Sequence, residues 1–503
     1  MEVLLAVLQF KLLAYTFIGT FVGIVAAAIP GFTITMAIIL SFPFTYGMTP
    51  LEGLSMLMGV YIGGYSGGQI SGILLGIPGT PSSICTTFDG YPMAKRGEAA
   101  RALGIGIFSS FFGGLIGVLI LIVFLAPMAE LGLKFGPWEM CSLIVFSLTL
   151  IASLSSASFF KGLLVGALGL FFSTIGMDPL CGHMRFTFGF HELNGGLNFL
   201  PILIGLFAFP QLLDAISKSK KRKGQGKESE SLITSKFKIP YRQVFKDLKK
   251  NWFNLIRSGL IGSFVGALPG AGGIISNFLS YDQAKKASKN RKNFGKGCPD
   301  GIVASEAGNN GTAGGTLIPT LGLGIPGSVP TAVMLGVLMV HSILPGPGLF
   351  KEQPILVYGL FVALIIAHFF MLIIQLKIGS RFFLQLITRS PIHILIPLVL
   401  MCCAIGSLAL HNRMFDVWTF LFFGILGYLL RKAKYPLPPM IIGFILGPIA
   451  ETKLRQALSI DPNIYLFLTR PISLIFVILM FASVGFSFYQ IAKEKKGLKA
   501  LFT

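Results

Sequence analysis

Long apolar runs separated by short polar segments extend along most of this chain of 503 residues. Several of these runs reach about 20 residues, the length at which a helix crosses the hydrocarbon core of a bilayer. Such a helix satisfies its own backbone hydrogen bonds without help from water. The pattern therefore predicts an all-α polytopic membrane protein with about 10–12 membrane segments.

Two of the apolar runs are interrupted by nearly the same eight residues, GIPGTPSS at 76–83 and GIPGSVPT at 324–331. We call these segments the first break and the second break. Proline has no amide donor and glycine exposes the backbone, so each break frees N–H and C=O groups that lipid cannot satisfy. Paired breaks of this kind at corresponding positions of two halves indicate the substrate site of a secondary transporter.

The duplication extends beyond the breaks. Phe21-Val22-Gly23 followed by Pro30-Gly31 is repeated as Phe264-Val265-Gly266 followed by Pro269-Gly270, and the segment 63–68 resembles 311–316. We therefore expect four parts: a first membrane repeat at 1–216, a basic cytoplasmic linker at 217–251, a second membrane repeat at 252–450, and an extra membrane segment with a basic tail at 451–503.

The positions of the basic residues predict that the two repeats are inverted. The loop at 46–52 has no Lys or Arg, whereas its counterpart at 282–300 has six. Two further pairs of loops differ in the same way, and cytoplasmic loops are the ones enriched in Lys and Arg. Inversion requires the segments around Pro30-Gly31 and Pro269-Gly270 to be re-entrant hairpins. One loop disagrees, because Lys453, Arg455 and Arg470 would lie outside.

The composition agrees with a membrane protein and excludes other classes. Hydrophobic residues make up 53% of the chain, charged residues only 12%, and the mean hydropathy is +0.77. The net charge of +21 comes from basic residues grouped between apolar runs, so we expect contact with the lipid bilayer and no binding of nucleic acid. The six cysteines and six histidines lack the spacing of metal or redox motifs, so no metal site, no catalytic residue and no enzyme activity is expected.

Several blocks of the sequence resemble one known family. They are Pro78–Ser83 with the following Asp89–Leu103, then Glu306–Asn310, Gly324–Ser328 and Leu344–Phe350. Together they resemble the large membrane subunit of tripartite tricarboxylate transporters, over about residues 20–470 and in the expected order. The chain departs from the family pattern at Ser305, where proline is usual, and at Ile84-Cys85 and Pro330, where small residues are usual.

The resemblance implies a multi-pass permease subunit in the bacterial inner membrane. It would import carboxylates such as citrate and other di- or tricarboxylates, together with a small membrane subunit and a periplasmic solute-binding protein. A cation gradient of sodium ions or protons would drive the import. The chain has no G-x-x-x-x-G-K-[ST] loop to hold a nucleotide, which agrees with transport that does not use ATP.

The breaks supply the groups that a carboxylate needs in a low-dielectric site. Interrupted helices present N–H groups and the positive end of a helix dipole, and hydroxyls lie beside them. The candidate substrate-binding residues are Gly79, Thr80, Pro81, Ser82, Ser83, Gly327, Ser328 and Thr331. Side-chain oxygens and freed carbonyls suit a sodium ion, so the candidate ion-coupling residues are Asn309, Asn310, Glu306, Gly76 and Gly324.

Alternatives remain for single residues and for the whole chain. The prolines and glycines could simply kink helices, and Asp89, in an Asp-Gly-Tyr-Pro segment, is expected to have a structural role as a cap or in a turn. An intramembrane aspartyl protease is excluded, because Ile325 stands where its second aspartate would be. An ion or solute channel stays open, since glycine-rich broken helices also line pores. The sequence leaves open the substrate, the coupling ion, the oligomeric state, and whether transport uses a rocking or an elevator-like movement.

Overall fold

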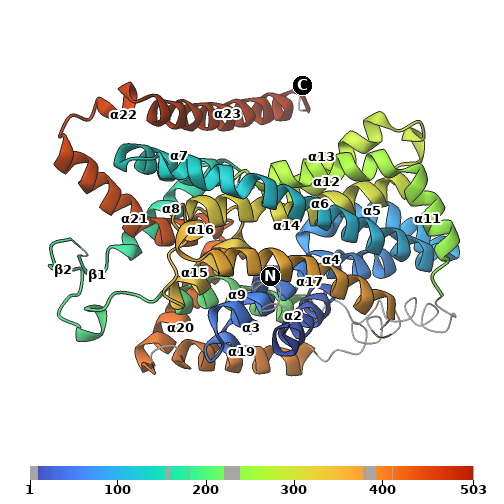
Figure 1. The fold of residues 1–503 in the computed structure, drawn as a ribbon, viewed down its shortest axis with the longest axis horizontal. Helices are drawn as coiled ribbons and strands as arrows, with labels where there is room; N and C mark the ends of the chain where they lie inside the picture. Colours follow the sequence, from blue (N-terminus) through green and yellow to red (C-terminus); the bar gives the residue numbers. More distant parts are fainter. Residues whose placement is uncertain are drawn as a thin grey trace. The chain divides into compact units, whose positions relative to one another are not determined.

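The computed structural model describes residues 9–154, 159–178, 180–219, 238–377, 382, 392–409 and 412–501 (Figure 1). Nearly all of the described secondary structure is helical, which confirms the predicted all-α class. The chain packs as two compact units. Unit 1 comprises Met1–Ala129 and Phe207–Arg413, and unit 2 comprises Glu130–Leu206 and Met414–Thr503.

Unit 1 holds both breaks. Its elements, with those that continue across its boundary, are α2 (Phe10–Ala28), α3 (Ile34–Ser41), η1 (Phe42–Thr45), α4 (Pro50–Leu75), η2 (Pro81–Ser83), α5 (Ile84–Met93), η3 (Ala94–Glu98), α6 (Ala99–Leu133), α9 (Phe199–Ser219), α11 (Tyr241–Lys250), α12 (Trp252–Gly266), α13 (Gly272–Ala287), η5 (Arg291–Asn293), α14 (Pro299–Leu323), α15 (Val329–Val340), α16 (Leu349–Glu352), α17 (Pro354–Lys377) and α19 (Ile392–Ala409). Of the predicted basic linker, residues 220–237 lie outside the described residues.

Unit 2 is also helical, with one short hairpin. Its elements are α7 (Pro137–Leu154), α8 (Phe159–Ser173), β1 (Gly176–Met177), β2 (Met184–Arg185), η4 (His191–Leu193), α20 (Met414–Lys432), α21 (Pro438–Ile460), α22 (Leu466–Thr469) and α23 (Pro471–Leu501). The strands β1 and β2 pair antiparallel.

The first predicted hairpin is present. A Cβ at Gly19 would collide with the carbonyl oxygen of Met56, and one at Gly23 with that of Val60. From the first contact to the second, the residue number rises by four on both helices. The helices α2 and α4 therefore run parallel. Because α2 and α4 begin at the same side, α3 must return the chain to that side between them. This confirms the re-entrant segment expected around Pro30-Gly31.

The second hairpin repeats this arrangement. Gly262 on α12 lies against Gly308 on α14, and Gly266 lies against Thr312 one turn further on. The helices α12 and α14 therefore also run parallel, and α13 returns between them. Small residues at these contacts let the helix backbones approach closely, as is usual where membrane helices pack.

The central helices of the two predicted repeats cross in opposite directions. The Tyr61 hydroxyl of α4 lies 2.5 Å from the Thr316 hydroxyl of α14, and the Asn309 amide of α14 donates to the Tyr65 carbonyl at 3.0 Å. Moving forward along α4 thus means moving backward along α14. This antiparallel pairing is what inverted repeats require, while the repeat boundaries at 216, 252 and 450 stay predictions.

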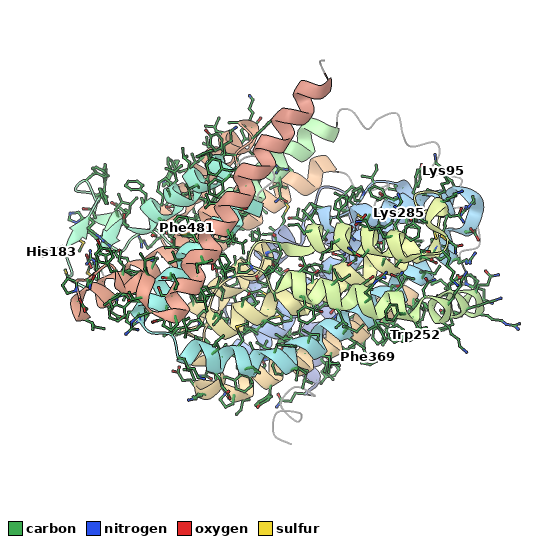
Figure 2. The ribbon with its side chains drawn as sticks, turned by 90° about the horizontal axis from the view of Figure 1, so that it is seen from above. Lys95, His183, Trp252, Lys285, Phe369 and Phe481 are labelled. Atoms are coloured by element: carbon green, nitrogen blue, oxygen red, sulfur yellow. The ribbon has the colours of Figure 1, made fainter. Side chains whose placement is uncertain are left out.

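Basic residues that the charge pattern assigns to one side gather at one end of unit 1. Figure 2 shows Lys95, Lys285 and Trp252 at the same end of this unit, on the right of the view. The guanidinium group of Arg96 donates to the backbone carbonyl of Gly297 at 2.7 Å, which joins the two basic loops directly. Both loops are predicted to be cytoplasmic.

Four helical spans among the described residues are long and apolar enough to cross a membrane by length and composition, at Phe10–Ala28, Pro81–Leu133, Pro354–Lys377 and Met414–Lys432. The helices α4 and α14 are not among them, since α4 is rich in Gly and Ser, and α14 is rich in Gly and also holds Thr and Asn. Almost all of their side chains are buried inside unit 1. Within unit 1, the two helices of more polar composition are therefore the buried ones.

The loop whose charges disagreed with the inverted topology lies in unit 2, and its arginines are paired. Arg455 forms ion pairs with Asp178 at 2.8 Å and with Glu451 at 2.8 Å, and Arg470 pairs with Glu139 at 3.0 Å. A paired arginine contributes no free positive charge at this face. Two of the three residues that disagreed are therefore neutralised within the fold.

Candidate functional site

Each break begins where a long central helix ends in a left-handed glycine. Gly76 follows α4 with φ 69°, and Gly324 follows α14 with φ 72°. Glycine adopts this conformation without the clash that a Cβ would cause, so it ends helices efficiently. After a few extended residues a new helical segment starts within each break, at Pro81 in the first break and at Val329 in the second.

The predicted hydroxyl residues form the same capping arrangement at both breaks. The Ser83 hydroxyl donates to the Thr80 carbonyl at 2.9 Å and accepts from the Thr80 N–H at 3.4 Å. At the second break, the Thr331 hydroxyl makes the equivalent bonds with the Ser328 backbone, both at 2.9 Å. These pairs satisfy N–H groups that the start of a helix leaves free.

The second glycine of each break allows close contact with its own repeat. The Gly79 N–H donates to the Gly68 carbonyl of α4 at 3.1 Å, and a Cβ at Gly79 would collide with the carbonyl oxygen of Ala27. The Gly327 carbonyl accepts from the Gly270 N–H at 2.9 Å. Each break thus packs against the turn region of the re-entrant hairpin in its own repeat.

Side chains from the two breaks meet around a pair of tyrosines on α4. The rings of Tyr61 and Tyr65 pack edge to face with centroids 5.0 Å apart, and the Ser328 hydroxyl lies near both phenol groups. Ser82, Tyr65 and the Asn309 amide oxygen all lie around Gly273 of α13, each within 3.1 Å of where a Cβ would stand. The structure therefore brings together Ser82, Ser328 and Asn309, three of the predicted residues.

The arrangement is closed in this conformation. The side chains of Thr80, Ser82 and Ser328 are 2%, 6% and 7% exposed, and Tyr61 and Tyr65 are buried. The two tyrosines were missed from the sequence. The sequence did contain an indication of them, because two tyrosines one turn apart in a glycine-rich apolar helix place two hydroxyl donors on one face.

Glu306 lies in a second polar cluster and is fully buried. Its carboxylate accepts hydrogen bonds from Thr86 at 2.5 Å, from Ser110 at 2.8 Å and from the Asn310 amide at 3.4 Å. Thr86 also lies 3.1 Å from the Ser305 hydroxyl. All of these partners are neutral, which is unusual because a buried carboxylate normally has a cationic partner.

The side-chain oxygens near Glu306 fit a hard cation. Asn309 and Asn310 each have an amide oxygen without a hydrogen-bond partner among the described residues. Carboxylate, amide and hydroxyl oxygens are the ligands that such cations prefer. The two asparagines lie on different faces of α14, however, because Asn310 contacts Glu306 while Asn309 contacts Tyr65.

Gly76 and Gly324 do not join this cluster. Gly324 lies 18 positions after Glu306, which is about 27 Å along α14 at 1.5 Å per residue. Gly76 lies against the ring of Tyr91. The residues predicted to couple the ion are thus divided, with Glu306 and Asn310 in one cluster, Asn309 beside Tyr65, and the helix-ending glycines elsewhere.

Asp89 has the structural role that was expected, because its carboxylate caps backbone N–H groups, although the residue itself does not lie in a turn. It lies inside helix α5 and not in a turn, because Pro92 is accommodated in the last turn of that helix. Its carboxylate accepts from the backbone N–H groups of Gly295, Gly297 and Cys298 at 2.7–2.9 Å, and from the Tyr281 hydroxyl at 2.7 Å. Asp89 therefore holds the loop before α14 against α5.

A polytopic helical protein with two broken helices around a buried polar centre belongs to the class of membrane transport proteins. Residues 13–442 match the model of the Tripartite tricarboxylate transporter TctA family. The chain belongs to this family, which confirms the resemblance seen in the sequence blocks, and it is a tricarboxylate transporter subunit.

Two relatives come from Agrobacterium vitis. One, described as an uncharacterized 52.8 kDa protein in the TAR-I ttuC' 3'region, is 34% identical over 462 residues, covering 92% of this chain and 90% of that protein. The other, an uncharacterized protein in the TAR-II ttuC' 3'region, is 34% identical over 213 residues, covering 42% of this chain and 87% of that protein. No solved structure matches this chain.

Proposed function

We propose that this protein is the permease subunit of a binding-protein-dependent secondary transporter that imports carboxylates across the bacterial inner membrane. The observation that carries the proposal is the position of one serine from each break near the buried tyrosines of α4, Ser82 near Tyr65 and Ser328 near both Tyr61 and Tyr65. A periplasmic solute-binding protein delivers the substrate, and a small membrane subunit completes the system.

The donors around the tyrosines suit an anionic substrate. The hydroxyls of Ser82, Ser328 and the two phenols can each donate to a carboxylate oxygen, and the first turn of α15 adds backbone N–H groups. These donors are neutral, so they hold a citrate-like anion without a counter-charge that would trap it. Release on the far side of the membrane then needs no cationic group to be neutralised.

The coupling cation binds at Glu306 in this proposal. A buried carboxylate without a cationic partner is costly in a low-dielectric interior. A sodium ion or a proton removes that cost, and it also offsets the charge of the incoming carboxylate. The Thr86 hydroxyl lies between Glu306 and Ser305, so it can donate to either oxygen as the charge on Glu306 changes.

Alternating access requires the closed site to open to each side in turn. Both breaks lie in unit 1, so a rocking or an elevator-like movement can carry the complete site. Either movement is compatible with a substrate bound between the two breaks.

The test is uptake of a radiolabelled carboxylate panel into proteoliposomes that contain this chain and its partner subunits. Wild type is compared with the double variant Ser82→Ala/Ser328→Ala, under a sodium gradient, a proton gradient or neither. We expect saturable, gradient-dependent uptake that falls at least about tenfold in the double variant, because two donors to the substrate are lost. The gradient that drives uptake identifies the coupling ion.

A matched control is the double variant Ser41→Ala/Ser147→Ala. Both serines are buried, and each donates to a carbonyl of its own helix. Uptake should stay near the wild-type rate. Unchanged uptake in Ser82→Ala/Ser328→Ala would reduce the breaks to structural kinks, and uptake that neither saturates nor follows a gradient would identify a channel instead.

A further inference from the structure

The short helix α11 is fixed by one face to the beginning of α6 in unit 1. The Arg101 guanidinium of α6 donates to both oxygens of the Asp247 carboxylate, at 2.8 and 2.9 Å. The rings of Phe108 on α6 and Phe245 on α11 lie with their centroids 4.8 Å apart. Val244 of α11 is fully buried. An ion pair and apolar packing therefore hold α11 in place while its other side stays open.

The open side of α11 is basic. Arg242, Lys246, Lys249 and Lys250 are exposed, and none of the four forms an ion pair with a residue that the structure describes. The acidic residue of the helix, Asp247, is already paired with α6. Four cationic groups on so short a helix favour an anionic membrane surface, because anionic headgroups attract Lys and Arg that lie near them.

An apolar groove begins beside this basic face. It has a volume of about 530 Å³ and is formed by α6, α11 and α12, with Phe112, Leu119, Lys249, Trp252 and Ile256 among its lining residues. The lining side chains are hydrophobic apart from Lys249. From Phe112 to Leu119 the groove follows α6 for about 10 Å at 1.5 Å per residue. One leaflet of the hydrocarbon core is about 15 Å thick, so the groove fits an acyl chain of one leaflet.

The helices that form the groove leave α11 in the same direction. Ile116 of α6 lies against Gly259 of α12. Further along both helices, Phe124 packs against Phe264 with ring centroids 5.9 Å apart. The helices α6 and α12 therefore run parallel here. The basic face of α11 lies at one end of the groove, and the hydrophobic walls continue away from it.

This end of the groove lies on the side that is predicted to be cytoplasmic. Figure 2 shows Trp252, the first residue of α12, at the end of unit 1 that also holds Lys95 and Lys285. Trp252 is 61% exposed, as is usual for a tryptophan at the interface between membrane and water. A lipid of the cytoplasmic leaflet would thus have its headgroup beside α11 and its acyl chains along the groove.

We propose that this groove binds an anionic phospholipid of the cytoplasmic leaflet, with the phosphate at Lys249 and Lys250 and an acyl chain between α6 and α12. Charge complementarity selects the headgroup, because the basic face of α11 is matched by a lipid with a net negative charge and not by a zwitterionic one. The hydrophobic walls hold the chain. The site goes beyond the proposed function and does not depend on which solute is transported.

Quenching of tryptophan fluorescence by brominated lipid tests the site. The chain has three tryptophans, so Trp138→Phe/Trp418→Phe leaves Trp252 alone, at the groove. This variant is reconstituted into phosphatidylcholine vesicles that contain increasing fractions of phosphatidylglycerol brominated on its acyl chains, or of brominated phosphatidylcholine. We expect the quenching curves to show that phosphatidylglycerol binds beside Trp252 about tenfold more strongly than phosphatidylcholine.

Charge variants in the same background test the headgroup site. Lys249→Gln/Lys250→Gln should reduce the preference for phosphatidylglycerol to within about twofold, because two cationic partners of the phosphate are lost. Lys249→Arg/Lys250→Arg keeps both charges and should keep the preference. The matched control Lys289→Gln/Lys292→Gln removes two exposed lysines from a loop at the same predicted face, and should leave the preference unchanged.

A second reporter separates this site from ordinary lipid contact. Trp418 on α20 is 62% exposed, and a chain with Trp418 as its one tryptophan should show no preference between the two lipids. The same preference at Trp418 and Trp252 would overturn the proposal, as would equal quenching of Trp252 by both lipids or a preference that survives Lys249→Gln/Lys250→Gln. If neither lipid quenches Trp252, another part of the chain or another subunit covers the groove, and the proposal is wrong.

Discussion

At the scale of single residues, polar groups in this protein are defined by the partners they have inside the core. Glu306 has hydroxyl and amide partners without a cation, whereas Asp89 is saturated by backbone N–H groups and a phenol. In the proposed function the carboxylate of Glu306 binds the cation, whereas the carboxylate of Asp89 holds backbone groups in place. Sequence position alone did not separate these roles.

Thr86 gives a direct test of the Glu306 cluster. Thr86→Val keeps the shape but removes a donor 2.5 Å from the carboxylate, so the purified protein should lose about 1–3 kcal/mol of stability in thermal unfolding. It should also need a higher cation concentration for half-maximal uptake. Thr86→Ser keeps the hydroxyl and should behave like wild type; a wild-type cation dependence in Thr86→Val would contradict this role.

The stability of the protein should depend on pH through Asp178, in the loop between α8 and α9. Backbone N–H groups of Leu180 and Cys181, together with Arg455, lower the pKa of Asp178 to about 2. Because the folded pKa is below the unfolded value of about 3.9, its contribution to stability is complete above about pH 4 and is lost as the pH falls towards 2.

The measurement compares wild type with Asp178→Asn in thermal unfolding between pH 7 and pH 3. Wild type should be the more stable protein at pH 7, and the difference should shrink as the pH falls. Asp282→Asn removes an exposed carboxylate that pairs with Lys286 within one helix, and should change stability little at any pH. A wild-type advantage that grows at low pH would contradict the assignment.

At the scale of helices, each break is built by the same devices. A left-handed glycine ends a long helix, a second glycine permits close contact with the hairpin of its own repeat, and a pair of hydroxyls caps the next segment. Matching geometry at two distant places in the chain agrees with the predicted duplication, and the capping bonds give the hydroxyls a structural role in both copies.

Gly79→Ala and Gly327→Ala should each destabilise the protein by about 1–3 kcal/mol or more, since a Cβ there meets backbone atoms that cannot move away easily. Thermal unfolding in detergent measures this, and uptake should fall with it. Gly47→Ala is the matched control, because a Cβ at Gly47 meets nothing within 4 Å. Equal behaviour of all three variants would show that the breaks are loosely packed.

At the scale of the whole molecule, the two parallel pairs α2 with α4 and α12 with α14 place the central helices in opposite directions. That arrangement and the distribution of basic loops indicate the same inverted topology. The topology assigns the loop at 178–196 to the outside and the loop at 288–297 to the cytoplasm.

Cys181 offers a test of this topology because it is exposed, whereas Cys85, Cys141, Cys298 and Cys403 are buried. In a chain that carries Cys402→Ser, a membrane-impermeant maleimide added to intact spheroplasts should label the protein, and it should fail to label the chain that also carries Cys181→Ser. In that background Ser288→Cys should be labelled only after the cells are opened. Labelling of Ser288→Cys in intact spheroplasts would contradict the inverted arrangement.

Local sequence determined most of what depends on neighbouring residues. The apolar runs specified membrane helices, the Gly-Ile-Pro-Gly segments specified where α4 and α14 end, and the two Pro-Gly pairs specified the re-entrant turns. These features follow from backbone chemistry and from the cost of leaving polar groups in lipid, so they can be read without knowing the fold. The family resemblance rested on the same local blocks.

Only the tertiary structure decided which distant side chains share a site. Tyr61 and Tyr65 lie near Ser328, which follows them by more than two hundred residues in the chain. A series of hydrogen bonds connects Gln375, Gln69 and Ser110, on three other helices, to Glu306. A helix has several faces, and the sequence does not state which neighbour each face will contact. For that reason Asn309 and Asn310, adjacent in the chain, lie in two different polar clusters once the helices have packed.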